Sequence, residues 1–454
     1  MNVYSDILSM IGHTPMLQLS RLDTGPCQLF LKLEFQNPGG SIKDRIAVAM
    51  VEAAEKSGKL KPGGTIIEAT AGNTGLGLAL IAAVKGYKLI LVLPDKMSKE
   101  KIAHLKAFGT EVILTRSDVQ KGHPEYYQDL AQSITKKTPN CFYINQFANP
   151  NNPAAHKATA QEVWQQLDYN VDAVVCGVGS GGTVTGITQF IRDQSLASKI
   201  ILADPVGSVL ADYIETGQLG KAASWKVEGI GEDFLPSICD LSAVSDAYAI
   251  SDKDSFATAR ELLRKEGLFV GSSTGTLVCA ALRYCRAQTQ PQRVVTFAGD
   301  NGGKYLSKMF NDQWMLDQGF HPAPHQGDLT DLLNFRYDYK ETITLAPKET
   351  LATAFIRMKQ NALSQLPVME NQQIMGLVTE KTLMNAVQNP SNFNQTADGV
   401  MHTNLERIEF NAPLSTLYAI LEQGATAVVM QQKKFLGLIT PTDYISHQYR
   451  RFIQ

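Results

Sequence analysis

Long apolar runs, closely spaced cysteines and an excess of either charge are absent from this chain of 454 residues. No uninterrupted apolar stretch approaches the roughly 20 residues that a membrane-spanning helix needs. The formal net charge of -2 offers no basic surface for nucleic acid or anionic lipid. The first residues, Met-Asn-Val-Tyr-Ser-Asp, lack the basic and then apolar pattern of a signal peptide. We therefore expect a cytoplasmic protein without nucleic-acid or membrane partners.

Disulfide and metal-site patterns are missing as well. The six cysteines form no C-x-x-C pair, and the eight histidines contain no H-E-x-x-H motif. Several of the cysteines lie inside apolar runs, which is typical of buried free thiols in a reducing compartment. We expect neither a disulfide framework nor a metal site.

What the chain does contain is an alternation of strand and helix patterns. The β-rich runs cover residues 65–68, 89–93, 111–114, 171–176, 200–203 and 294–297, and the helical runs cover 74–85, 99–108, 184–192, 256–265 and 277–286. Alternation of this kind predicts an α/β fold with a mostly parallel sheet and helices on both faces. The active site of such a fold lies in the loops that follow the carboxyl ends of the strands.

The texture changes near residue 319, where a turn-rich and aperiodic segment begins. Beyond it the chain repeats itself. Leu-Pro-Val-Met (366–369) leads to Gly-Leu-Val-Thr (376–379), and 61 residues later Ala-Val-Val-Met (427–430) leads to Gly-Leu-Ile-Thr (437–440). Chance similarity of two βαβ units is the alternative, but the matched valine-to-glycine gap favours duplication. We predict a catalytic domain at 1–318, a linker at 319–332 and a paired module at 333–454.

The most informative short segment is Ser41-Ile42-Lys43-Asp44-Arg45, which follows the turn sequence Asn-Pro-Gly-Gly. The S-x-x-D spacing of Ser41 and Asp44 predicts a capping box and a helix start. Lys43 then lies in the first helical turn, where the helix dipole disfavours a positive charge. A lysine with a depressed pKa suits imine formation, because only the neutral amine attacks a carbonyl. The alternative is an ordinary solvated lysine.

Three glycine-rich loops each follow a strand and precede a helix, at 68–75, 177–183 and 298–304. The first suits a carboxylate, the second forms a nest for phosphate, and the third carries a polar pair. Tight strand-to-helix turns are the simpler reading of each. The second loop also contains G-x-G-x-x-G, with Asp204 at the end of the next strand. A nicotinamide-dependent oxidoreductase therefore remains a competitor.

The order and spacing of Ser41–Arg45, Ala71–Gly75 and Gly179–Thr183 resemble the pyridoxal phosphate (PLP) β-family of fold type II. That family includes cysteine synthases and cystathionine β-synthases, and the resemblance extends over residues 5–320. It implies a tryptophan-synthase-β-like core of two subdomains with parallel sheets. Glu228–Gly231 is similar to the family's mobile active-site segment. The repeat resembles the tandem α+β regulatory pair (CBS or Bateman module) of cystathionine β-synthases.

The resemblance implies site residues by position. Lys43 is the residue that binds the PLP aldehyde covalently and shuttles protons, and Asn73 is the partner of the PLP 3′ oxygen. The resemblance implies that the 5′-phosphate is bound by Gly179, Ser180, Gly181, Gly182 and Thr183. It implies that the substrate carboxylate is bound by Thr70, Ala71, Gly72, Thr74 and Gln146.

Some positions depart from the family pattern. Asn301 stands where Ser or Thr usually faces the pyridine nitrogen, and Ala71 stands where a serine is common. Phe147 and Glu232 occupy positions where animal cystathionine β-synthases have tyrosines near the substrate, so substrate identity is open. The haem-binding extension of the animal enzymes has no counterpart before residue 5, and we predict no haem.

In such modules a G-h-x-T-x-x-D run contacts an adenosine ribose. The second copy has it, ending in Thr440 and Asp443, whereas the first copy has Thr382 in place of the aspartate. The resemblance thus implies one regulatory site for S-adenosylmethionine or an adenine nucleotide. A module that serves only assembly is the alternative.

The resemblance implies a lyase-type β-replacement that joins serine and homocysteine into cystathionine, a transsulfuration step of cysteine biosynthesis. A cysteine synthase using O-acetylserine and sulfide is the alternative within the family. An adenosyl-sensing scaffold with an inactive catalytic half is a further competitor. The family also implies a homodimer or a larger homo-oligomer.

Overall fold

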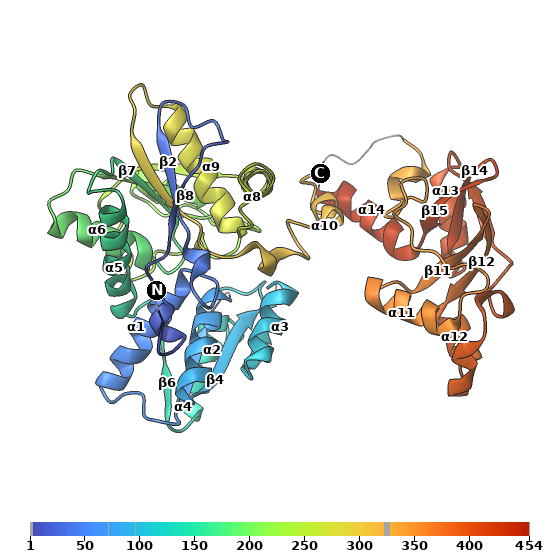
Figure 1. Cartoon of the computed structure of the whole chain (residues 1–454), viewed down its shortest axis with the longest axis horizontal. Coiled ribbons are helices and arrows are strands. Elements are labelled where there is room, and N and C mark those ends of the chain that lie inside the picture. The colour runs from blue at the N-terminus through green and yellow to red at the C-terminus, as the bar shows by residue number, and fades with distance from the viewer. Residues whose placement is uncertain (1–2, 71, 96, 322–326, 454) are drawn as a thin grey trace. The chain divides into compact units, whose positions relative to one another are not determined.

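The computed structural model describes residues 3–70, 72–95, 97–321 and 327–453. It divides into two compact units, Met1–Asn311 and Asp312–Gln454. Figure 1 shows the elements of each unit. The domain boundaries at 1–318 and 333–454, with a linker between them, stay a prediction.

The larger sheet of the first unit has six strands, and every neighbouring pair is parallel except β1 and β2. In spatial order these are β1 (Met16–Gln18), β2 (Gln28–Lys32), β10 (Arg293–Phe297), β7 (Ala173–Cys176), β8 (Lys199–Pro205) and β9 (Val244–Ile250). Helices α5 (Asn151–Gln166) and α6 (Gly182–Asp193) lie on one side, and α8 (Asp252–Glu266) and α9 (Ser272–Arg286) on the other (Figure 1). The short helix α7 (Leu210–Thr216) follows β8.

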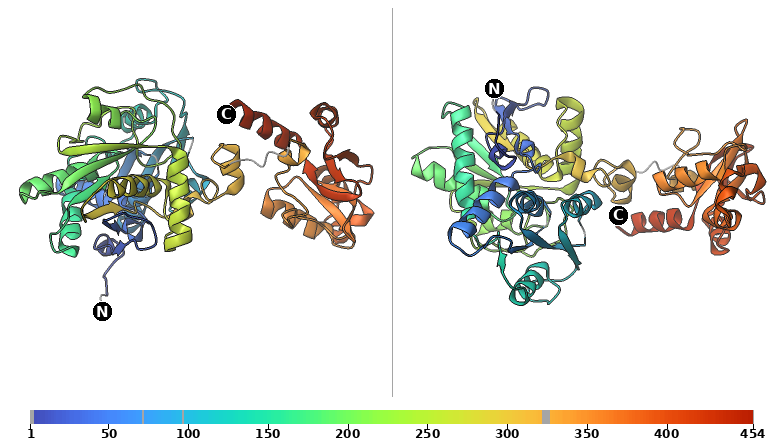
Figure 2. Two further views of the ribbon diagram at one scale, coloured as in Figure 1. Left: turned by 90° about the horizontal axis from the view of Figure 1, so that it is seen from above. Right: turned by 60° about the horizontal axis from the view of Figure 1, so that its bottom comes forward.

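A second sheet is built from the chain between α1 and α5. Its four parallel strands lie in the order β5 (Glu111–Thr115), β4 (Lys88–Pro94), β3 (Thr65–Ala69) and β6 (Cys141–Tyr143). Its helices are α2 (Asn73–Lys85), α3 (Lys99–Ala107) and α4 (Tyr127–Lys137). Helix α1 (Lys43–Lys56) packs Ile46 and Met50 into the core of this sheet. Figure 2 shows the first unit from two further sides, with helices covering its strands.

The predicted α/β alternation is confirmed, and the predicted elements appear within a few residues of their expected bounds. The parallel strands are divided between two sheets, as the two-subdomain core requires. Strand β2 was not predicted. It lies beside β10, more than 260 residues away in the chain, and only the tertiary fold brings them together.

The second unit contains two similar halves. The first half has α11 (Leu351–Asn361), β11 (Gln365–Glu370), β12 (Gln373–Thr379) and α12 (Glu380–Ala386). The second has β13 (Glu406–Glu409), α13 (Leu414–Glu422), β14 (Ala427–Gln431), β15 (Lys434–Ile439) and α14 (Pro441–Ile453). Helix α10 (Asp312–Asp317) also belongs to this unit, and Asp317 pairs with Arg450 of α14 at 3.0 Å.

The hairpins of the two halves share one irregularity. The register of β11 and β12 shifts between Val368 and Met369, and that of β14 and β15 shifts between Val429 and Met430. The shifts are 61 residues apart, which matches the repeat seen in the sequence. Both hairpins contribute to one buried apolar cluster, so each half covers the other. The Leu329–Leu332 turn, inside the predicted linker, is buried in the core of the second half.

Candidate functional site

Lys43 is the first residue of α1, as the sequence predicted. The predicted capping box does not form. Ser41 Oγ accepts a hydrogen bond from the Lys43 N–H at 3.2 Å, but the Asp44 carboxylate accepts from the N–H of Gly39 at 2.6 Å. The preceding turn folds back over the helix, and a Cβ at Gly39 would lie 2.5 Å from Asp44 Oδ1. Asp44 therefore fixes the turn before Lys43 and does not close the cap.

Lys43 is half-buried, and its surroundings favour the neutral form of its amine. Burial lowers the pKa of Lys43, and the opposing attraction of Asp300, Glu232 and Glu34 does not cancel that effect. Burial also lowers the pKa of His156 well below its usual range, and the charge of Lys43 adds to this. The amine is therefore close enough to interact with the charge of Asp300, and its own positive charge disfavours protonation of His156.

Backbone contacts place Lys43 where the two sheets meet. The N–H of Ile42 donates to the carbonyl of Gly299 in the third loop at 2.9 Å, and Ser41 pairs with Asp300. On the other side, a Cβ at Gly77 of α2 would lie 3.2 Å from the Lys43 carbonyl oxygen. Helix α2, which follows the first glycine loop, and the third glycine loop thus both contact the segment that carries Lys43.

The first loop gathers most of the residues expected to bind the carboxylate. Gly72 has φ of 120° at the cap of α2, a conformation that favours glycine, and its N–H donates to Thr70 Oγ1 at 3.1 Å. Thr74 Oγ1 donates to Gln146 Oε1 at 2.7 Å. Thr70, Gly72, Thr74 and Gln146 therefore lie together. Ala71 lies outside the described residues.

The second loop excludes side chains. Gly181, with φ of 86°, caps α6, and a Cβ there would lie 2.5 Å from that of Cys239. A Cβ at Gly179 would lie 2.6 Å from the Gly229 carbonyl oxygen, and one at Gly182 only 1.8 Å from Asn152 Oδ1. The loop leads into the amino terminus of a 12-residue helix, whose first N–H groups lack partners within the helix.

Two residues of α5 support this loop, and the sequence did not single them out. Asn152 Nδ2 donates to Ser180 Oγ at 2.9 Å. His156 Nε2 lies 3.3 Å from Thr183 Oγ1, and its Nδ1 lies 3.2 Å from Thr159 Oγ1. Because burial keeps His156 neutral, one ring nitrogen can donate while the other accepts. Their spacing of four residues on a helix was the only sequence signal.

The third loop holds a polar cluster. Asn301 Oδ1 accepts from the Gly303 N–H at 2.7 Å, and no described residue accepts a hydrogen bond from its Nδ2. Asp300 is fully buried, and its Oδ2 accepts from Asn73 Nδ2 at 2.8 Å and from the Tyr305 hydroxyl at 2.6 Å. Asp300 Oδ1 has no hydrogen-bond partner among the described residues.

The acidic residue of the dinucleotide-like pattern does not face the glycine loop. Asp204 Oδ2 accepts from the N–H groups of Leu210 and Ala211 at 3.2 and 2.9 Å, at the start of α7. Its carboxylate is fully buried in that role. The nicotinamide interpretation loses the acidic residue on which it depended.

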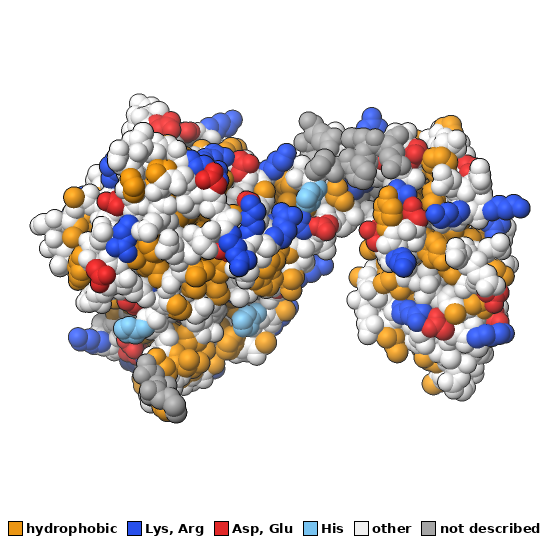
Figure 3. Space-filling model, turned by 45° about the horizontal axis from the view of Figure 1, so that its top comes forward, with side chains coloured by type: hydrophobic (Ala, Val, Ile, Leu, Met, Phe, Trp, Pro, Cys, Tyr) orange, Lys and Arg blue, Asp and Glu red, His pale blue; other side chains and the backbone are white. Residues whose placement is uncertain are grey.

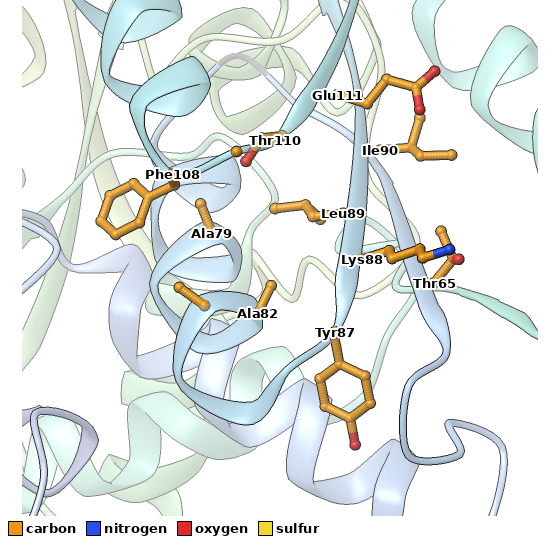
Figure 4. A pocket seen from close by; sticks show the side chains of 12 residues that line it. Thr65, Ala79, Ala82, Tyr87, Lys88, Leu89, Ile90, Phe108, Thr110 and Glu111 are labelled. Atoms are coloured by element: carbon orange, nitrogen blue, oxygen red, sulfur yellow. The ribbon is translucent and has the colours of Figure 1, made fainter.

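A surface pocket lies elsewhere in the smaller sheet (Figure 4). Thr65, Lys88 and Glu111 line it, and each is the first residue of its strand. The pocket is therefore at the amino ends of β3, β4 and β5, whereas ligands of α/β folds bind at the carboxyl ends. This pocket is therefore not the candidate active site.

In the second unit, the Asp443 carboxylate is already engaged. Its Oδ2 accepts from the backbone N–H and the hydroxyl of Thr440 at 2.7 and 2.6 Å, and its Oδ1 accepts from Asn334 Nδ2. In the first half, Thr382 takes the equivalent place, with its N–H donating to Thr379 Oγ1 at 3.1 Å.

Other functional groups are not apparent in the described part of the chain. All six cysteines have free thiols, and no cluster of ligands that could hold a metal ion occurs among the described residues. None of the described helices is long and apolar enough to cross a membrane. On the face shown in Figure 3, acidic and basic side chains both occur on each unit.

Comparisons with known proteins show what this chain is similar to. Residues 7–300 match the family model described as pyridoxal-phosphate dependent enzyme, and residues 337–389 match the CBS domain. Proteins named cystathionine beta-synthase are 37% identical in Mus musculus, over 95% of this chain and 78% of that protein, and 35% identical in Saccharomyces cerevisiae, over 97% of each.

Solved structures also resemble a large part of this chain. A hydrogen sulfide-producing enzyme from Fusobacterium nucleatum matches with a TM-score of 0.63 and 37% identity, over 67% of this chain and 100% of that one. An O-acetylserine dependent cystathionine beta-synthase from Helicobacter pylori matches with a TM-score of 0.63 and 34% identity, over 68% and 99%.

Proposed function

Because the chain belongs to the family of pyridoxal-phosphate dependent enzymes, we propose that it is a β-replacement enzyme that condenses L-serine with L-homocysteine to L-cystathionine. The observation that carries this proposal is the position of Lys43. A half-buried lysine with a lowered pKa opens α1, and its segment contacts helix α2 and the loop that follows β10. The extent of the similarity to cystathionine beta-synthases supports the choice of substrates.

The residues present fit the cofactor of the family. Neighbouring groups occupy the space that a Cβ would take at Gly179, Gly181 or Gly182, so these positions require glycine. They lie at the amino terminus of α6, which suits a phosphate. Ser180 and Thr183 add hydroxyls there, and Lys43 supplies the amine. No described residue accepts a hydrogen bond from Asn301 Nδ2. This group would donate a hydrogen bond to the ring nitrogen of PLP without protonating it.

When bound, PLP would supply the electron sink that stabilises negative charge at the substrate Cα. The chain's own residues would do the rest. Lys43 Nζ would take the proton from the serine Cα and pass it to the hydroxyl that leaves Cβ as water. It would then accept the thiol proton of homocysteine as the sulfur bonds to Cβ, and deliver that proton to Cα. Burial lowers the pKa of this amine and so favours the neutral form that general-base chemistry requires.

Thr70, Gly72, Thr74 and Gln146 would bind the substrate carboxylate. The Thr74 hydroxyl and the Gln146 amide bond to each other at 2.7 Å and so present a fixed pair of polar groups. The N–H groups at the start of α2 add a positive end of a helix dipole. Holding the carboxylate there would keep the Cα–H bond oriented toward Lys43, which is the entropic part of the catalysis.

The alternative is a cysteine synthase that uses O-acetylserine and sulfide. It is supported by the similarity to an O-acetylserine dependent enzyme and to a hydrogen sulfide-producing enzyme. Mass spectrometry of four reactions, serine or O-acetylserine with homocysteine or sulfide, separates the possibilities. Cystathionine from serine supports our proposal. Cysteine from O-acetylserine and sulfide as the single efficient reaction contradicts it.

We further propose that the second unit binds an adenosyl ligand, S-adenosylmethionine or an adenine nucleotide, through Thr440 and Asp443. The CBS-domain match in this unit supports a regulatory role. Calorimetry against S-adenosylmethionine, ATP and AMP tests it, and absence of heat with all three would refute it. We also propose a homodimer or a larger homo-oligomer, which light scattering would detect.

A further inference from the structure

The Asn73 side chain lies between a buried carboxylate and a buried ammonium group. Its Nδ2 donates to Asp300 Oδ2 at 2.8 Å, and its Oδ1 accepts from Lys304 Nζ at 3.1 Å. Asp300 is fully buried, and Lys304 is only 7% exposed. Little bulk water therefore competes for these hydrogen bonds, which strengthens both of them.

These two charges allow one orientation of the amide. Reversing it would set the amide oxygen against the carboxylate and the amide NH2 against the ammonium, and both hydrogen bonds would be lost. Asp300 uses only one of the two hydrogens on Nδ2. The second hydrogen is left for an acceptor on a ligand.

Both charged groups are themselves fixed. The Tyr305 hydroxyl donates to Asp300 Oδ2 at 2.6 Å, and the Gly271 N–H donates to the Asp300 carbonyl at 3.0 Å. Lys304 Nζ donates to the carbonyl of Gly40 at 2.9 Å, in the turn before α1. The positions of the two charges are therefore set by the Tyr305 hydroxyl and by the backbone of two other segments.

A chain of buried polar contacts extends this arrangement to the segment Glu228–Gly231. The Tyr305 hydroxyl accepts from Lys101 Nζ at 2.9 Å, and Lys101 pairs with Glu228 at 2.8 Å. Lys308 pairs with the other oxygen of Glu228 at 2.6 Å. Burial raises the pKa of Glu228, but the two ammonium groups outweigh that effect and hold it below its usual value.

We propose that Lys304 and Asp300 are positioning residues that orient the Asn73 amide so that its second N–H hydrogen meets the 3′ oxygen of PLP, an inference that rests on the function proposed above. The positive charge of Lys304 also favours an ionised ring oxygen on the far side of the amide. Burial lowers the pKa of Lys304 to about 8, with Asp300 and Asp44 opposing this and Lys101 adding to it. The charge is thus present at neutral pH.

The test uses the full-length protein freed of cofactor and titrated with PLP. We expect Lys304→Met to weaken PLP affinity roughly tenfold, the effect of one charge-assisted hydrogen bond. We also expect it to raise the midpoint of the pH titration of the bound chromophore, because a positive charge has been removed. Asp300→Asn removes a negative charge and should lower that midpoint. Lys304→Arg should restore part of the affinity, and Lys106→Met, on an exposed position of α3, should match the native protein.

Opposite shifts of the midpoint in Lys304→Met and Asp300→Asn support the proposal, because loss of structure alone would not give them opposite signs. Native affinity and an unshifted midpoint in both variants would overturn it. Failure of the native chain to take up PLP is a different result, since it would refute the proposed function itself. Borohydride reduction of the native protein, followed by peptide mapping of Lys43, identifies that case.

Discussion

Asn152 donates a hydrogen bond from Nδ2 to Ser180 Oγ at 2.9 Å, and so joins α5 to the second glycine loop. The same Nδ2 donates to the carbonyl oxygen of Gln146 at 2.8 Å. Its Oδ1 occupies the place that a Cβ of Gly182 would need. Asn152 therefore connects the proposed phosphate loop with the proposed carboxylate site.

Gly182→Ala should abolish this fit. The new methyl group would lie 1.8 Å from Asn152 Oδ1, so either the loop or α5 must move. We expect PLP affinity to fall at least about tenfold and the melting temperature to drop by several degrees, as overpacking typically costs 1–3 kcal/mol. PLP titration and thermal unfolding measure both. Gly399→Ala, in the second unit with open space around it, is the matched control. Native PLP affinity in Gly182→Ala would contradict the phosphate assignment.

Glu68 of β3 should make stability depend on pH. Burial raises the pKa of Glu68 to about 8, and its Oε2 has no hydrogen-bond partner among the described residues. Between its ordinary value near 4.5 and pH 8, the folded protein keeps a proton that the unfolded chain releases, so stability falls as pH rises. Glu68→Gln should remove this loss and gain roughly 2 to 5 kcal/mol at pH 8.

Denaturant unfolding at several pH values checks this prediction. The matched control is Glu55→Gln, a surface glutamate that pairs with Lys85 at 2.7 Å and accepts from the Tyr87 hydroxyl. That variant should lose a little stability, no more than about 1 kcal/mol, since exposed pairs contribute little. A Glu68→Gln protein with the same pH slope as the native one would show that Glu68 is not protonated in the folded state.

Asn334→Ala should strengthen adenosyl binding. Asn334 Nδ2 donates a hydrogen bond to Asp443 Oδ1, so a ribose hydroxyl must displace Asn334 before the hydroxyl can bind this oxygen. Removing the competitor should raise affinity by roughly fivefold to tenfold, equal to about one net hydrogen bond. Asp443→Asn should abolish binding, and calorimetry measures both variants. Weaker binding by Asn334→Ala would mean that Asn334 supports the site and does not compete for it.

Lys43→Ala should remove turnover and the colour of bound PLP together. We expect product formation to fall by about a thousandfold or more, because the variant lacks both the amine and the proton carrier. Absorbance before and after borohydride, with product analysis, measures this. Lys59→Ala, on an exposed position after α1, serves as control. Retention of a borohydride-sensitive band by Lys43→Ala would assign the amine to another lysine.

Local patterns carried much of the prediction. Short sequence patterns predicted the helix start at Lys43, the three glycine loops and the repeat in the second unit. Glycine content and hydrophobic period affect structure over one turn or one strand, so neighbouring residues are enough to show them. The prediction of a capping box was wrong because it considered only the spacing of Ser41 and Asp44. In the structure the Asp44 carboxylate accepts a hydrogen bond from the Gly39 N–H instead, and that spacing could not show this contact.

By itself the sequence determined the alternation of strands and helices, where glycine is required, and which lysine opens a helix. Only the tertiary structure decided which charges surround that lysine. Asn152, His156 and Lys304 lie more than 100 residues from Lys43 in the chain, and no spacing rule joins them to it. Their roles come from burial and from hydrogen bonds between distant segments, and those interactions exist only once the two sheets have packed together.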